Sequence, residues 1–271
     1  MKIALIQQHA GPSVERNIER GVAHFKQAVA SGAELIVYPE VVFQRFFPQH
    51  KRQGSPYVPD AETIPGPLTD RFSRLAREAG VVTVLNLYEQ EGDHRYDASP
   101  VIDADGSLLG VTRMLHIMDG PGFYEQDYYD PGDRGVQVYE TAVGRLGVAI
   151  CYDRHYPEVM RALGVGGADL VVVPQAGAVD EWPGGLFEAE LQVAAMQNGF
   201  FTALANRVGE EDSLTFAGES FVTDPRGQVI ARGPRGEDAI VLADLDFSLL
   251  ADCPARRHFL KDRRPEIYPL K

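Results

Sequence analysis

The chain has 271 residues and a formal net charge of -13 at pH 7, with 44% hydrophobic and 24% charged residues. This composition is typical of soluble globular proteins, because such a chain can bury enough apolar surface to offset the entropy lost on folding. The negative charge would repel a nucleic-acid backbone or an anionic membrane surface. We therefore expect neither as a partner.

The cysteine content and the N-terminus both favour a cytoplasmic protein. Two cysteines, Cys151 and Cys253, are too few for a disulfide framework in a chain of this size, which favours a reducing compartment. The first apolar run is broken by Gln7 and Gln8, so it is too short for a signal peptide. No run approaches the roughly 20 apolar residues of a membrane span. Since no stretch has linker composition, we expect one domain over 1–271.

Strands and helices alternate in the predicted order of elements, which indicates an α/β fold. Short runs that are apolar at consecutive positions predict strands at 2–7, 33–40, 81–88, 145–153, 169–175 and 200–206. Helices are predicted at 13–31, 67–79, 156–166 and 186–199. The second helix has Thr69 as a plausible cap and Gly80 as its stop. The turns "DADG" and "DPRG" predict β-hairpins at 101–111 and 221–231.

Two residues with useful chemistry stand at the ends of predicted strands. Cys151 follows "GVAI", and a thiol there gains backbone N–H groups of the turn, which favour a thiolate and an oxyanion. The alternative is a small buried hydrophobic residue, which is what most free cysteines are. Glu40 closes "LIVYPE", where a carboxylate can act as general base at the mouth of a sheet. Its alternative is an exposed loop glutamate.

A polar segment in mid-chain, "GVTRMLHIMDGPGFYEQDYYDPGD", carries more charge than a turn needs but has no lysine. Part of it belongs to a series of motifs in a familiar order: "LIVYPE", "DGPGFYEQDYYDPGD", "GVAICYDRHYPE", "ADLVVVPQAG", "AAMQNGFFTALANRVG" and "FVTDPRGQVIA". Together they resemble the nitrilase superfamily, the carbon–nitrogen hydrolases. The resemblance implies a four-layer αββα sandwich without metal or organic cofactor. It also implies a homodimer or higher homo-oligomer, with a small amide, N-carbamoyl or nitrile substrate.

The resemblance assigns roles to individual positions. It implies that Cys151 is the nucleophile, Glu40 the base and Glu125 a supporting second glutamate. The backbone N–H of Tyr152 would be one of the two oxyanion donors. The other would be a lysine in a motif resembling Tyr-Arg-Lys-x-His, which here reads "TRMLH", so that Met114 holds its place.

The missing lysine leaves the activity open. Methionine has no N–H, and no lysine occurs between Lys51 and Lys261. Losing one oxyanion donor typically costs about 10² to 10³ in rate. The protein is then either a slow enzyme or a pseudoenzyme that binds a small molecule or a partner. Alternatively, another group donates the hydrogen bond to the oxyanion, or the methionine was introduced on purpose. If 108–116 is a strand, His116 shares the face of Met114 and is the better replacement, while Arg113 points away.

Arg154 gives the main indication of the substrate. A guanidinium beside the nucleophile can hold a carboxylate through two parallel hydrogen bonds. "CYDRHYPE" resembles the equivalent stretch in enzymes that hydrolyse N-carbamoyl amino acids. A salt bridge to Asp153, Glu158 or another local acid is the alternative. The "DGPG" run instead resembles N-carbamoylputrescine amidases, whose substrate is cationic, so the two indications conflict. Unpaired histidines and the lack of Cys-x-x-Cys argue against a metal site.

Overall fold

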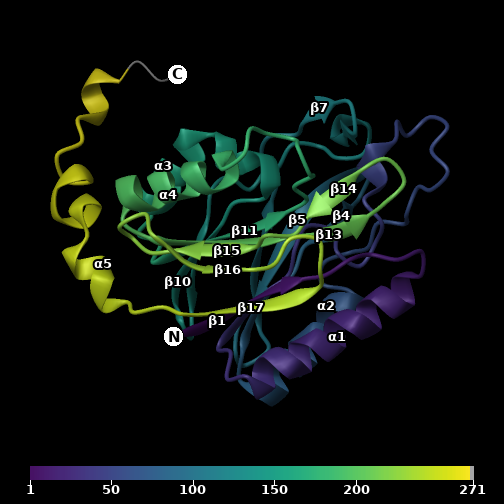
Figure 1. Ribbon diagram of the computed structural model, residues 1–271, viewed down its shortest axis with the longest axis horizontal. Coiled ribbons are helices and arrows are strands. Elements are labelled where there is room, and N and C mark those ends of the chain that lie inside the picture. The colour runs from purple at the N-terminus through teal and green to yellow at the C-terminus, as the bar shows by residue number, and fades with distance from the viewer. Residues whose placement is uncertain (269–271) are drawn as a thin grey trace.

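Two β-sheets packed face to face form the centre of the molecule (Figure 1). The computed structural model describes residues 1–268, so the last three residues of the predicted single domain lie outside it. Within 1–268, no helix is both long and apolar enough to span a membrane.

The first sheet has seven strands in the order β17–β1–β2–β3–β5–β4, with β6 paired to β5. Its strands are β1 (Lys2–Gln7), β2 (Leu35–Val37), β3 (Val82–Val84), β4 (Leu87–Glu91), β5 (His94–Ile102), β6 (Leu108–Arg113) and β17 (Ala239–Asp244). The central strands β1, β2 and β3 are parallel. Polar side chains and the loops that connect the strands to other elements therefore lie at the ends of these strands.

The second sheet has six strands in the order β16–β15–β12–β11–β10–β9. They are β9 (Val138–Thr141), β10 (Gly144–Val148), β11 (Leu170–Gln175), β12 (Phe201–Asn206), β15 (Phe221–Thr223) and β16 (Val229–Arg232). Two small hairpins complete the strands: β7 (Asp119–Gly120) with β8 (Phe123–Tyr124), and β13 (Val208–Glu210) with β14 (Thr215–Ala217). Strands β10, β11 and β12 are parallel, as in the first sheet.

Helices cover the outer face of each sheet. The α-helices are α1 (Val14–Ala30), α2 (Pro67–Ala79), α3 (Pro157–Val165), α4 (Leu186–Asn198) and α5 (Ser248–Asp252). The short helices are η1 (Phe47–Gln49), η2 (Glu125–Asp127), η3 (Cys151–His155), η4 (Ala255–Phe259) and η5 (Pro265–Ile267). In Figure 1, α1 and α2 lie below the sheets and α3 and α4 above them, and the C-terminal segment runs past α3 and α4.

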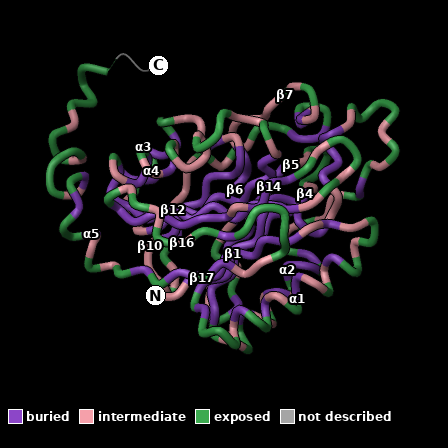
Figure 2. Tube along the Cα trace, in the orientation of Figure 1, coloured by how far each residue is buried: buried purple, intermediate pink, exposed green. Residues whose placement is uncertain are grey.

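Side-chain alternation along the strands divides the core into three layers, which Figure 2 shows as buried chain between exposed outer surfaces. On β1, Ile3 and Leu5 face the other sheet, whereas Ala4 and Ile6 face α1 and α2. On β11, Val172 faces the first sheet and Val171 faces α3 and α4. Both sheets are therefore buried on both faces, and the predicted four-layer αββα sandwich is confirmed.

Most predicted elements are found within a few residues of their predicted bounds, with three corrections. The predicted strand 81–88 is divided at Leu85 and Asn86 into β3 and β4. The predicted strand 145–153 ends at Val148, before Cys151 begins η3. Gly66, not Thr69, is the N-cap of α2; the Thr69 hydroxyl lies at the third helical position and accepts from the Gly66 N–H at 2.7 Å. Gly80 does end α2, with a left-handed φ of 67°.

Candidate active site

Cys151 lies just after β10, where the chain turns into the one-turn helix η3. Its φ of 42° is unusual for a residue with a side chain. The side chain is 6% exposed, and the Gln175 side-chain amide at the end of β11 donates to its sulfur at 3.3 Å. The thiol is therefore held at the carboxyl ends of two parallel strands, with narrow access to solvent.

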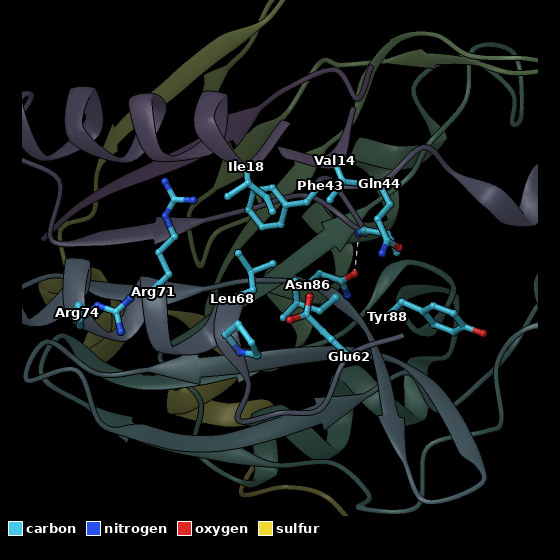
Figure 3. A pocket seen from close by; sticks show the side chains of 13 residues that line it. Val14, Ile18, Phe43, Gln44, Glu62, Leu68, Arg71, Arg74, Asn86 and Tyr88 are labelled. Carbon is cyan, nitrogen blue, oxygen red and sulfur yellow. Dashed lines mark hydrogen bonds between the residues drawn. The ribbon is translucent and has the colours of Figure 1, made fainter. Parts of the chain in front are cut away.

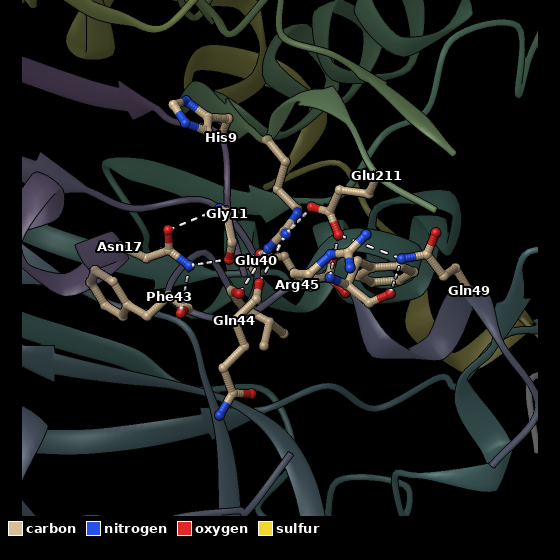
Figure 4. Close-up of polar contacts among 12 residues, drawn as sticks. His9, Gly11, Asn17, Glu40, Phe43, Gln44, Arg45, Gln49 and Glu211 are labelled. Atoms are coloured by element: carbon tan, nitrogen blue, oxygen red, sulfur yellow. Dashed lines mark hydrogen bonds and ion pairs between the residues drawn. The ribbon is translucent and has the colours of Figure 1, made fainter. Parts of the chain in front are cut away.

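Glu40 lies after the end of β2, in the loop that also carries Gln44 (Figure 4). Arg207, just beyond β12, donates to the carbonyls of Glu40 at 2.8 Å, Val41 at 2.7 Å and Gln44 at 2.9 Å. Its charge is paired with Glu211. Glu40 is completely buried, contrary to the exposed loop glutamate considered as an alternative.

The second glutamate comes from the polar mid-chain segment. Glu125 begins the short helix η2 and is almost fully buried. Its carboxylate accepts from the Met118 backbone N–H at 3.2 Å. One oxygen of Glu125, one oxygen of Glu40 and the sulfur of Cys151 all lie within 4.8 Å of one another. The fold thus brings together three side chains that are far apart in the sequence.

The three atoms are also close enough to contact one metal ion, the only such grouping among residues 1–268. One sulfur with two carboxylates lacks the histidines and the further cysteines of a structural zinc site. A thiol beside two carboxylates is instead a combination that nucleophilic and acid–base chemistry can use.

Burial and mutual repulsion control the charges in the site. Burial, and then the neighbouring Glu125 charge, raise the pKa of Glu40 to about 8. Burial also raises the pKa of Glu125, and that of the Cys151 thiol, which Glu40 and Glu125 raise further. The site therefore cannot hold all of these groups ionised at once, so transfer of the thiol proton has to be coupled to attack on a substrate.

Met114 is completely buried in the same core cluster as Cys151. It lies one residue beyond the end of β6, and its backbone N–H donates to the Asp97 carbonyl at 2.9 Å. Arg113 does point elsewhere: its guanidinium contacts Glu89 at 2.7 and 2.8 Å. The position that the resemblance gives to the lysine is therefore buried in the core, and its side chain offers no hydrogen-bond donor.

His116 is held by a neighbouring acid. The strand predicted at 108–116 ends at Arg113, so the expected alternation does not extend to His116. The His116 ring stacks on Tyr156 with centroids 3.5 Å apart, and Nδ1 lies 2.7 Å from an Asp153 oxygen. The same carboxylate accepts the backbone N–H groups of Leu115 and His116. These contacts fix the chain that follows Met114.

Arg154, in η3, is connected to Cys151 through Gln175. The Arg154 guanidinium donates to the Gln175 side-chain carbonyl at 2.8 Å and stacks over the Phe187 ring at 4.3 Å from its centroid. Its acidic partner is Glu190, at 3.2 Å, and not Asp153 or Glu158. One terminal nitrogen, Nη2, is buried without a hydrogen-bond partner among residues 1–268.

Three further residues around the site were missed by reasoning from sequence. Gln175 and Arg207 stand at or just beyond the ends of predicted strands, and this position was the signal that could have found them. Asp97 lies inside β5 and is completely buried, although its sequence context "RYDAS" carries no motif. Its importance depends on strand pairing, which one sequence does not reveal.

Comparison with known proteins identifies the family. The family model described as carbon-nitrogen hydrolase matches residues 2–255. The chain belongs to the carbon–nitrogen hydrolase family. The nitrilase-superfamily relationship expected from the motifs is thereby confirmed.

Relatives of this carbon–nitrogen hydrolase align over almost its whole length. A citrullinase from Francisella tularensis is 31% identical over 99% of this chain and 96% of its own. An N-carbamoylputrescine amidase from Arabidopsis thaliana is 30% identical over 98% of this chain and 93% of its own. These names cover more than one N-carbamoyl substrate, so the family assignment alone does not select one.

Solved structures of other carbon–nitrogen hydrolases have the same fold. A carbon–nitrogen hydrolase from Helicobacter pylori superposes with a TM-score of 0.91 at 29% identity, covering 99% of this chain and 97% of its own. A variant amidase from Nesterenkonia sp. AN1 superposes with a TM-score of 0.80 at 26% identity, covering 98% and 94%. In that structure the acetamide moiety of fluoroacetamide is attached to the active-site cysteine.

Proposed function

We propose that this protein hydrolyses a carbon–nitrogen bond in a small N-carbamoyl compound or amide through a thioester on Cys151. The observation that carries this proposal is the approach of the Cys151 sulfur and the Glu40 and Glu125 carboxylates to within 4.8 Å. A nucleophile and a base at this separation can act on one substrate carbon. The proposal assigns the general base to Glu40 and a supporting role to Glu125.

The proposed reaction has two halves. Glu40 takes the thiol proton as the Cys151 sulfur attacks the carbonyl carbon, and then passes that proton to the leaving nitrogen, so that ammonia or an amine departs. A water molecule then attacks the thioester carbon, giving a proton to Glu40 and releasing the Cys151 sulfur, which recovers the proton. The Tyr152 backbone N–H is assigned as an oxyanion donor.

For the substrate, the proposal favours an N-carbamoyl compound. Citrullinase and N-carbamoylputrescine amidase are the names of relatives at about this identity, and both support that class. The unpartnered Nη2 of Arg154 supports a substrate that also carries a carboxylate. The pairing of Arg154 with Glu190 instead leaves less net positive charge for such a group. A panel of substrates decides whether the substrate carries a carboxylate.

Ammonia release tests the proposed function. The panel contains N-carbamoyl amino acids, N-carbamoylputrescine and simple amides, each incubated with the native protein and with Cys151→Ala. We expect ammonia from at least one N-carbamoyl compound, and no release above background in C151A. Cys253→Ala is the matched control, since Cys253 is buried elsewhere and should leave the rate unchanged. Equal rates in native protein and C151A would refute the thioester mechanism.

A second candidate function, a nitrilase-fold pseudoenzyme that binds a small molecule, is favoured by one observation. Met114 is buried at the lysine position and offers no hydrogen-bond donor. The pseudoenzyme hypothesis predicts that a panel compound raises the melting temperature of the native protein without releasing ammonia. Binding accompanied by ammonia release excludes it.

A further inference from the structure

A buried acid beside Met114 has no role in the proposed mechanism. Asp97 lies on β5, which pairs with β6 so that Ala98 is opposite Arg113. The Met114 N–H donates to the Asp97 carbonyl, which continues this ladder by one pair. Opposing residues of an antiparallel pair direct their side chains to the same face. Asp97 and Met114 therefore share one face of the sheet.

Asn86 connects Asp97 to the loop that carries Glu40. The Asn86 amide donates to Asp97 Oδ1 at 2.5 Å and to the Ser99 hydroxyl at 3.1 Å. Its carbonyl oxygen accepts from the Val41 backbone N–H at 2.7 Å, the contact drawn in Figure 3. On its other side Asn86 lines a cavity of about 370 Å³ between α1 and α2, which does not include Cys151. Asn86 thus holds Asp97 close to the residue after Glu40.

Three carboxyl oxygens in this region lack donors. Both Glu40 oxygens and Asp97 Oδ2 are buried, and no N–H or O–H of residues 1–268 donates to them. Asn86 contacts both Asp97 and the residue after Glu40, which brings the two buried carboxyl groups close together. Two carboxylates at this separation in a dry site cannot both ionise. A single proton between them would satisfy both groups.

We propose that Glu40 and Asp97 share one proton, and that Asp97 is a positioning residue which holds Glu40 as a proton-accepting carboxylate beside Cys151. This inference rests on the proposed function for the role of Glu40. Asp97 in its acid form donates to the Glu40 carboxylate, a contact that the Met114 side chain cannot make. The pair holds one proton at rest and two protons while Glu40 carries the proton of the Cys151 thiol. It holds one proton again after that proton has passed to the leaving nitrogen.

The surroundings determine how this pair titrates. The ionisable groups that face it are Glu125, Tyr129, Cys151, Asp153 and Arg207. Burial, and then the Glu40 charge, raise the pKa of Asp97 well above its usual range. Removing the last proton from the pair leaves two negative charges near Cys151, which oppose formation of the thiolate. The protonation state of the pair therefore affects how readily the Cys151 thiol ionises.

The pH dependence of Cys151 alkylation tests this linkage without requiring turnover. Iodoacetamide labelling of the Cys151 peptide is followed by mass spectrometry in native protein, Asp97→Asn and Ser99→Ala. In D97N the pair has lost one titrating group, so the midpoint of labelling should fall by about one pH unit. S99A removes another Asn86 contact on the same strand without removing a proton, and should titrate like the native protein. Identical midpoints in native protein and D97N overturn the proposal.

The pH profile of kcat/KM gives a second readout. In the native protein kcat/KM should fall on the alkaline side as the shared proton is lost, whereas D97N should keep its activity there. D97N should also keep its neutral-pH rate within about tenfold, because an amide N–H can still donate to Glu40, while Asp97→Ala should lose about 10². An alkaline limb unchanged in D97N overturns the proposal. Absence of turnover in native protein overturns the proposed function alone, because the alkylation test still stands.

Discussion

The placement of Cys151 and Glu40 after the ends of strands was predicted from sequence for a physical reason. Parallel strands place their carboxyl ends at one edge, so polar residues after "LIVY" and "GVAI" were expected there. The structure adds a backbone feature at each place: φ is 42° at Cys151 and 43° at Val41, next to Glu40. Such conformations persist only where surrounding contacts impose them. Here the contacts of Arg207, Gln175 and Asn86 do so.

The rest of the site could not be derived from residue patterns. Glu125 was assigned through the resemblance alone, because nothing in "GFYEQD" separates it from its acidic neighbours. Asp97 was missed because its significance arises from the pairing of β5 with β6, opposite Met114. Strand register is a tertiary property, and alternation within one strand does not specify the partner.

Glu40 makes the stability of the protein depend on pH. Its pKa rises on folding from 4.5 to about 8, so the folded protein holds a proton that the unfolded chain has lost over this interval. The free energy of unfolding should therefore decrease as pH rises from about 5 to about 8. Glu40→Gln has the same shape and no charge, so its melting temperature should fall less over this range. Parallel melting curves for native protein and E40Q, measured by circular dichroism, would contradict this.

At the scale of elements, the sequence predicted the alternation of strands and helices but not their ends near the site. The strand predicted at 81–88 is interrupted at Asn86. The side chain of this residue forms hydrogen bonds with Val41 and Asp97. The strand predicted at 145–153 stops at Val148 so that the chain can turn at Cys151. Functional contacts thus override the apolar pattern at both places.

The loop after β2 depends on Arg207. Lysine in its place keeps the charge but cannot reach three carbonyls and a carboxylate with one ammonium group. We expect Arg207→Lys to lower kcat by about 10-fold to 100-fold, because Glu40 moves relative to Cys151. Arg232→Lys is the matched control: Arg232 pairs with Glu188 at the surface, so kcat should not change. If R207K and R232K have the same kcat, the loop does not depend on Arg207.

At the scale of the whole molecule, the face formed by α3 and α4 is the place where we expect a second copy to bind. Large apolar side chains are exposed there, including Val165 on α3 at 53% and Val193 on α4 at 47%. Between these helices and the C-terminal segment lies a cavity of about 690 Å³, lined in part by Met160 and Tyr268. The homodimer implied by the resemblance would cover this surface.

Val193→Glu tests this pairing. A charge in a buried interface is costly, so V193E should be monomeric at a concentration where the native protein is dimeric. The molar mass is measured by light scattering after gel filtration. Leu109→Glu, at a residue 38% exposed on β6, is the control and should keep the native mass. A native protein that elutes as a monomer, or a V193E variant that stays dimeric, would rule out this interface.

The central claim is that the site around Cys151 hydrolyses carbon–nitrogen bonds although Met114 stands at the lysine position. The most direct test compares ammonia release by native protein and Met114→Lys with the same N-carbamoyl compounds. We expect measurable Cys151-dependent release by the native protein, and a rate about 10² to 10³ higher in M114K, which regains an oxyanion donor. No release by the native protein together with activity in M114K would contradict it.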